Sequence, residues 1–133
     1  CLLVRPHKII AFDRVEDPTS IDELMQLIGA TPINWGFKTE CCGASLSIAR
    51  TDLVAKLSGN ILKDAADRGA EAIIVACPMC HSNLDMRRPQ IDEYVGKNIS
   101  TPVIYITQAI GLAVGLAPEK LGLQRHFVTV NTL

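Results

Sequence analysis

Five cysteines, divided between one single residue and two short motifs, constrain this chain more than any other feature. They are Cys1, Cys41, Cys42, Cys77 and Cys80. The first is followed by 39 residues, a Cys-Cys-Gly motif, 33 further residues and a Cys-Pro-Met-Cys motif. The last two thiols lie three positions apart, so a helical start brings both sulfurs to one side. Proline between them fits the first helical position, and a helix N-terminus favours the thiolate form that binds metal.

The adjacent pair, Cys41 and Cys42, cannot easily chelate one ion, because neighbouring side chains of an extended chain point to opposite faces. Gly43 allows a sharp turn after the pair and a close approach of the backbone to a bound group. Two neighbouring sulfurs then suit two metal ions of one cluster, or one sulfur that bridges two ions. Five thiolates exceed the four ligands of structural zinc or of an ordinary cubane cluster. They fit a four-iron cluster with a bridging thiolate, or a cubane beside a spare redox thiol.

Three other interpretations of the cysteines stay open at this point. Four of them could bind zinc in a non-enzymatic interaction module. Cys77 and Cys80 could form a thioredoxin-like dithiol, and all five could be small buried residues of a core. The two motifs favour a cluster, because chance seldom produces Cys-Cys-Gly followed by Cys-Pro-Met-Cys.

Composition narrows the class of protein. The chain has 133 residues, 48% hydrophobic and 20% charged, which suits a folded single domain. A net charge of −1 and only six aromatic residues argue against a nucleic-acid partner. No apolar run reaches the roughly 20 residues of a membrane span, and no signal-peptide pattern opens the chain. We therefore expect no membrane insertion and a cytoplasmic location, where cysteine sets more often bind metal than form disulfides. The chain starts with Cys, not Met, so we expect a piece of a longer protein.

Short apolar runs alternate with helical patterns, which predicts an α/β fold, a layered and largely parallel sheet with flanking helices. Residues 72–76 and 103–106 are typical of buried strands. The longest helix is expected over 51–68, with Leu53, Leu57, Ile61 and Ala65 on its buried face. Further helices are expected at 20–28, 78–86 and 108–114, and 32–38 reads as a short strand or extended segment. Ser20 and Glu23 predict a capping box for the first helix.

These elements place the cysteines at junctions. Cys77 follows a predicted strand at its carboxyl end, and Cys80 lies in the first turn of the next helix. Open parallel sheets bind ligands at those strand ends. We therefore expect all of the sulfurs to converge on one edge of the sheet.

The full pattern resembles the cysteine-rich CCG domain, and the flanking residues resemble the C-terminal cysteine-rich domain of the heterodisulfide reductase B-subunit. The matching segments are Cys1-Leu-Leu-Val-Arg5-Pro6, Glu40-Cys41-Cys42-Gly43-Ala44 and Cys77-Pro-Met-Cys80-His81-Ser-Asn83-Leu84-Asp85. The resemblance covers residues 1–133 as one CCG domain, which we expect to be a C-terminal fragment of a two-domain protein. The interval between Cys42 and Cys77 is shorter than the family pattern by a residue or two.

The resemblance implies a non-cubane [4Fe-4S] cluster, with zinc as the alternative metal. Its ligands, through which catalysis would occur, are Cys1, Cys41, Cys42, Cys77 and Cys80. Gly43 would lie beside the cluster, and His81 could donate a hydrogen bond to a cluster sulfur. An exposed helix position is the competing interpretation of His81, and surface positions are expected for His7 and His126. Surface positions are also expected for Arg5, Arg87 and Arg88, with contact to an anionic substrate or partner as the alternative.

The resemblance further implies a disulfide-reducing, heterodisulfide reductase-like oxidoreductase complex. The expected partners are an N-terminal companion domain of the same protein, an iron–sulfur C-subunit and a flavin-containing A-subunit. The substrate would be a small-molecule disulfide, such as the one that joins coenzyme M and coenzyme B, and the isolated fragment is expected to be inactive. An alternative is an electron-transfer domain without disulfide chemistry, as in lactate- or glycolate-oxidising enzymes.

Overall fold

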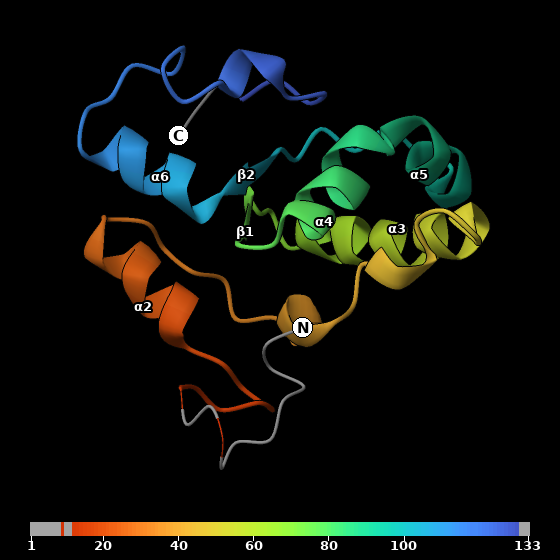
Figure 1. The fold of residues 1–133 in the computed structure, drawn as a ribbon, viewed down its shortest axis with the longest axis horizontal. Coiled ribbons are helices and arrows are strands. Elements are labelled where there is room, and N and C mark those ends of the chain that lie inside the picture. The colour runs from red at the N-terminus through yellow and green to blue at the C-terminus, as the bar shows by residue number, and fades with distance from the viewer. Residues whose placement is uncertain (1–8, 10–11, 131–133) are drawn as a thin grey trace. The chain divides into compact units, whose positions relative to one another are not determined.

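The computed structural model describes residue 9 and residues 12–130. The chain divides into two compact units, Cys1–Thr39 and Glu40–Leu133, each of which is described by itself. Figure 1 traces the elements in chain order. The first unit includes a helix and a short 3₁₀ turn, and the second includes the parallel strand pair and further helices. The predicted α/β class is confirmed.

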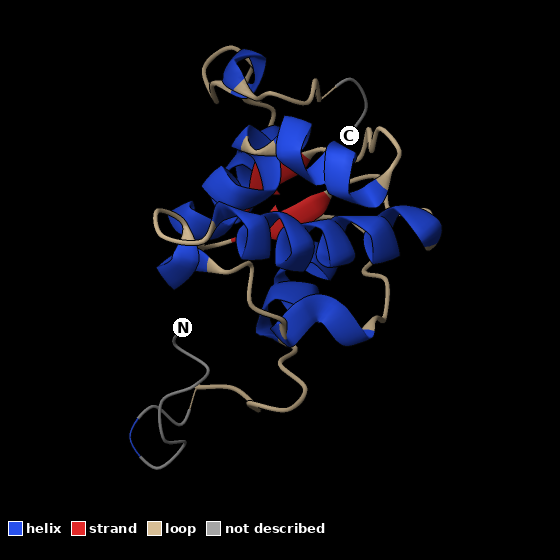
Figure 2. Cartoon of the chain, turned by 90° about the vertical axis from the view of Figure 1, so that its right-hand side faces the viewer, coloured by secondary structure: helices blue, strands red, loops and turns tan. Residues whose placement is uncertain are grey.

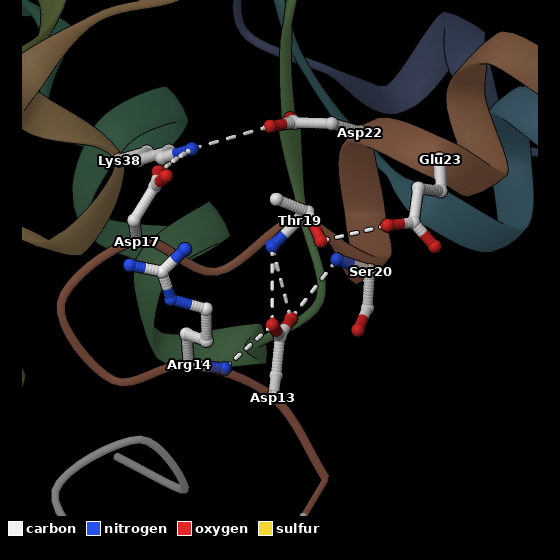
Figure 3. Close-up of polar contacts among 8 residues, drawn as sticks. All are labelled: Asp13, Arg14, Asp17, Thr19, Ser20, Asp22, Glu23 and Lys38. Atoms are coloured by element: carbon white, nitrogen blue, oxygen red, sulfur yellow. Dashed lines mark hydrogen bonds and ion pairs between the residues drawn. The ribbon is translucent and has the colours of Figure 1, made fainter.

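Helix α2 (Ser20–Leu27) begins at a carboxylate that comes from outside the helix. Asp13 accepts the backbone N–H groups of Thr19 at 3.1 Å and Ser20 at 2.9 Å (Figure 3). These bonds use donors that the first helical turn cannot satisfy internally. The Thr19 hydroxyl donates to Glu23 at 2.7 Å. The predicted capping box of Ser20 and Glu23 is therefore wrong, because a more distant side chain takes the cap.

The segment after α2 forms a 3₁₀ turn, Gly36–Thr39, in place of the predicted extended segment. Lys38 within it pairs with Asp17 at 2.6 Å and with Asp22 at 3.4 Å (Figure 3). Hydrogen bonding to Asp17 raises the pKa of Lys38 and lowers that of its partner. The turn therefore comes with ion pairs to residues of α2 and the segment before it, which the apolar pattern of residues 32–38 does not predict.

The long helix α3 (Thr51–Asp67) confirms the prediction for 51–68 almost to the residue. The predicted buried face is confirmed in part, because Ile61 and Ala65 are buried. Leu53 and Leu57 are only half-buried. The residues that the helix buries are Val54, Ala55, Ser58, Gly59, Ile61, Leu62 and Ala65. Helix α5 (Arg88–Val95) crosses this face closely, since a Cβ on Gly59 would lie 3.0 Å from side chains of Tyr94 and Val95.

Strands β1 (Ile73–Val75) and β2 (Val103–Tyr105) form a two-stranded parallel sheet, with Ile73 opposite Val103 and Val75 opposite Tyr105. Figure 2 shows the pair among helices. Val103 and Ile104 are fully buried, together with Val54, Leu62 and Ile91 of the neighbouring helices. The predicted strands are confirmed, and their burial explains their continuous apolar sequence.

Each strand leads directly into a helix. β1 is followed by α4 (Pro78–His81), a π-helical turn over Ser82–Met86, and α5. β2 is followed by α6 (Ile106–Ala113), and a 3₁₀ turn, Leu123–Arg125, comes later. The predicted helices at 78–86 and 108–114 are confirmed, although the first changes hydrogen-bond register part-way. No helix in the described part of the chain has the length and apolar character needed to cross a membrane.

Candidate metal centre

Four of the five predicted cysteine ligands lie in the described residues, all in the second unit. Cys41 and Cys42 precede α3, and Cys77 and Cys80 flank the start of α4. Figure 1 shows α4 beside the strand pair. Cys77 is the residue that caps α4, and Pro78 takes the first helical position as predicted. Cys1 falls outside the described residues.

The two motifs meet through one sulfur contact. The Sγ atoms of Cys42 and Cys80, separated by 38 positions in the sequence, lie 3.5 Å apart. Cys42 is 1% exposed, so its thiol has almost no access to water. Hydrogen bonding with the Cys80 thiol lowers the pKa of Cys42 to about 6, although burial acts in the opposite direction. The same shared proton raises the pKa of Cys80.

Cys77 gains its thiolate character from the backbone. The N–H groups of Cys80 and Met79, at the start of α4, lower the pKa of the Cys77 thiol. Free N–H groups at a helix start stabilise a nearby negative charge. Two of the described cysteines, Cys42 and Cys77, therefore favour the charged form that binds soft metal ions.

Cys41, unlike its neighbour Cys42, is exposed. Its Sγ accepts the backbone N–H of Gly43 at 3.3 Å. The sulfur contact between the two motifs is made by Cys42 and Cys80. Gly43 has a φ of +84°, and a Cβ there would lie 3.3 Å from side chains of Val54 and Leu57. The predicted sharp turn at Gly43 is therefore present, and a close approach to α3 adds a second reason for glycine.

Polar side chains around Cys42 were not predicted as part of the site. Ser58 of α3, fully buried, donates its hydroxyl to the Cys42 carbonyl at 3.0 Å. Asn83 of the π-helical turn, also fully buried, places Nδ2 3.4 Å from that carbonyl and 3.6 Å from Cys42 Sγ. One sequence signal was available, because Asn83 lies three positions after Cys80 and therefore on the same helical face.

His81 occupies a half-buried position beside the second strand, which differs from the exposed position considered for it. Its ring stacks on Tyr105 with centroids 4.4 Å apart. Burial lowers the pKa of the imidazole. His81 Nε2 lies 3.5 Å from Nδ1 of His126. Within the described residues, His81 Nε2 therefore faces the ring of another histidine. A hydrogen bond from His81 to a cluster sulfur stays a prediction.

His126, predicted on the surface, is instead part of a polar network. Its Nδ1 faces the Val103 carbonyl at 3.0 Å, and its Nε2 faces Gln108 Nε2 at 3.0 Å. A carbonyl only accepts, so Nδ1 carries the proton and Nε2 accepts from the Gln108 amide. Buried Asp85, with His81 and His126, presents ligand atoms within 4.8 Å of one another. Both nitrogens of His126 have hydrogen-bond partners, and Asp85 accepts the backbone N–H groups of Phe127 and Val128. These groups already serve hydrogen bonds of the protein itself, which argues against a second metal site.

The arginines near the site are also structural, which corrects their expected surface positions. Arg88 is 5% exposed and donates to the carbonyls of Leu84, Ile99 and Thr101 at 2.6–2.7 Å. Half-buried Arg87 donates to the Ser47 carbonyl at 2.6 Å. Their bonds to protein groups leave little reason to assign them to a substrate. Arg5 and His7 lie outside the described residues.

Comparison with known proteins places this site in a family context. The family model described as the CCG cysteine-rich domain matches residues 1–85, which include every cysteine. The B-subunit of the ferredoxin:CoB-CoM heterodisulfide reductase of Methanosarcina mazei is 31% identical over 130 residues, covering 96% of this chain and 43% of the relative. The B-subunit of the ferredoxin/F(420)H(2)-dependent CoB-CoM heterodisulfide reductase of Methanosarcina acetivorans is 32% identical, with the same coverage.

A third relative carries a different name. The "8-methylmenaquinol:fumarate reductase membrane anchor subunit" of Wolinella succinogenes is 26% identical over 133 residues, which are the whole of this chain and 47% of that protein. The chain thus spans less than half the length of these curated relatives. All three are named as subunits of reductases, which supports an oxidoreductase context for the domain.

Proposed function

Because the chain belongs to the CCG family of cysteine-rich domains, we propose that it binds an iron–sulfur cluster and serves as a redox domain in disulfide reduction. The cluster is of the non-cubane [4Fe-4S] type, with Cys1, Cys41, Cys42, Cys77 and Cys80 as ligands. The observation that carries this proposal is the 3.5 Å contact between the sulfurs of Cys42 and Cys80, which joins the two motifs. This contact brings a sulfur of each motif to one place, as a shared centre requires.

The donor set supports iron in preference to a hard metal. Soft thiolates select zinc, copper(I) and iron–sulfur clusters, whereas carboxylates suit magnesium and calcium. A pKa of about 6 keeps Cys42 largely deprotonated near neutral pH, and the lowered pKa of Cys77 favours its thiolate form. The cluster would supply one-electron transfer and an iron with affinity for sulfur. The chain's own residues hold the sulfurs, exclude water from Cys42 and fix the backbone at Gly43.

The relatives' names supply the proposed reaction and partners. Two of them name CoB-CoM heterodisulfide, and a further relative in Methanosarcina acetivorans is named as the D-subunit of a dihydromethanophenazine:CoB–CoM heterodisulfide reductase. We propose a substrate of this disulfide class, a companion N-terminal domain, and iron–sulfur and flavin subunits that deliver electrons in the cytoplasm. Turnover would need these partners, so the domain by itself is not expected to turn over.

One observation favours a second candidate. The Wolinella succinogenes relative is named for fumarate and a quinol, not for a disulfide, and it aligns with the whole of this chain. A CCG domain of this kind would pass electrons without cleaving a disulfide, which corresponds to the electron-carrier alternative. The two candidates share the cluster and differ only in whether a thiol reaches it.

A spectroscopic test separates them. The protein is reconstituted anaerobically with iron and sulfide, oxidised, and its EPR spectrum recorded with and without coenzyme M thiol. Disulfide chemistry predicts a new or shifted signal on addition of thiol, because the thiol binds at the centre. Iron with no response to thiol leaves the electron carrier. Zinc without iron would contradict both redox candidates and would indicate a zinc-stabilised structural module.

A further inference from the structure

We propose that Asn83 is a positioning residue of the candidate centre, whose side-chain amide holds Cys42 Sγ toward Cys80 and donates an N–H···S hydrogen bond to it. The positioning role rests on the contacts among protein atoms alone. The consequence for redox potential rests on the proposed cluster. Asn83 belongs to neither cysteine motif, and it reaches Cys42 across 41 positions of sequence.

The Asn83 side chain is buried, so its amide needs hydrogen-bond partners within the protein. The residue is 0% exposed, and a buried amide group left without hydrogen-bond partners destabilises a fold. Its Nδ2 lies 3.4 Å from the Cys42 carbonyl and 3.6 Å from Cys42 Sγ. Its Oδ1 lies 3.1 Å from Ser47 Oγ and 3.2 Å from Arg87 Nε. Each end of the amide therefore has two polar neighbours.

Arg87 decides which way the amide points. A guanidinium only donates hydrogen bonds, so the Asn83 atom that faces Arg87 Nε must be the carbonyl oxygen. The NH₂ group is then directed at Cys42, and it can only donate. Arg87 is itself held by its second bond, 2.6 Å from NH2 to the Ser47 carbonyl. A chain of donors thus runs from Arg87 through Asn83 to the Cys42 sulfur.

The same arrangement fixes Cys42 at two points. Its carbonyl accepts from both Ser58 Oγ, at 3.0 Å, and Asn83 Nδ2. Its sulfur accepts from Asn83 Nδ2 at 3.6 Å, and it lies 3.5 Å from Cys80 Sγ. The side chain has almost no water around it, so these contacts set where the sulfur points. Hydrogen bonds to ligand sulfurs stabilise the more negative, reduced state of a cluster and raise its potential.

The test uses two replacements of the amide and a matched control. Asn83→Leu removes the donor without adding charge, and Asn83→Ala does so with a smaller side chain in case the first variant does not fold. Asn60→Leu makes the first change at an exposed position of α3. Circular dichroism verifies folding. In the metal-free proteins, the diazene oxidant diamide takes two electrons and links two thiols, and mass spectrometry measures the rate at which Cys42 and Cys80 are joined.

In the reconstituted proteins, the midpoint potential of the cluster is measured by EPR-monitored titration. A positioning role predicts that folded Asn83 variants link Cys42 to Cys80 several-fold more slowly and shift the potential to a more negative value, whereas Asn60→Leu matches the wild type. Unchanged linking and unchanged potential in a folded Asn83 variant overturn the inference. If the wild type holds no iron, the proposed function fails, and the linking rate alone decides the role of Asn83.

Discussion

At the scale of single residues, the site depends on the burial of one thiol. Cys42 has water removed from around it, which alone would favour the neutral form. Hydrogen bonding with Cys80 outweighs that cost, because two sulfurs 3.5 Å apart share one proton between them. The outcome is a thiolate and a thiol side by side, which is a suitable starting state for metal to displace the remaining proton.

This pairing predicts the pH dependence of the metal-free protein. The pKa of Cys42 lies at about 6, below its ordinary value of 9.0, so its thiolate is expected to persist down to about pH 6. Cys80→Ala removes the largest cause of the shift, so thiolate formation at Cys42 should move to a distinctly higher pH. Ultraviolet thiolate absorbance against pH measures both. Identical titration curves for wild type and variant would contradict the pairing.

Gly43 carries a second prediction at this scale. A side chain at φ +84° costs about 1–2 kcal/mol, and a Cβ there also meets Val54 and Leu57 at 3.3 Å. Gly115 has a similar φ of +83° but nothing within 4 Å, so it isolates the backbone cost. Chemical denaturation should show a larger loss of unfolding free energy for Gly43→Ala than for Gly115→Ala. Equal losses would mean that contact with α3 is unimportant.

At the scale of elements, sequence patterns predict where helices begin and end better than they predict which residues the helices contact. Helix α3 begins at Thr51 without a side-chain cap, and Gly69, with a φ of +74°, follows its end as a local stop signal. The predicted buried face was right for Ile61 and Ala65 but not for Leu53 and Leu57, which are half-buried, because burial depends on where α5 crosses. The cap of α2 was missed for a related reason, since Asp13 comes from six residues before the cap.

The crossing of α3 and α5 can be tested directly. Gly59→Leu inserts a side chain where even a Cβ lies 3.0 Å from Tyr94 and Val95. Overpacking of this kind typically costs about 1–3 kcal/mol. Asn60→Leu makes a comparable change on the exposed side and should stay within about 0.5 kcal/mol of wild type. Thermal and urea unfolding measure the difference, and equal stability of the two variants would argue against a tight crossing.

At the scale of the whole molecule, the candidate site is a long-range feature. The two cysteine motifs indicated a metal centre from their spacing alone, and the α/β order placed Cys77 at a strand end. The sequence led us to expect converging sulfurs, and Asn83 shares a helical face with Cys80. The specific pairing of Cys42 with Cys80 and the other contacts of Asn83 need three segments to meet, so local patterns do not determine them. The family match ends at residue 85, and Asp85 accepts backbone N–H groups of Phe127 and Val128 beyond it. Residues outside the matched region therefore help to hold the helix that carries Cys80.

The central claim is that these cysteines hold an iron–sulfur centre, and metal analysis tests it most directly. Iron, acid-labile sulfide and zinc are measured per chain after anaerobic reconstitution, for the wild type and for Cys42→Ser. A [4Fe-4S] centre predicts about four irons and about four sulfides in the wild type and a large loss of both in the variant. Zinc without sulfide in the wild type, or full iron retention after loss of Cys42, would contradict the account.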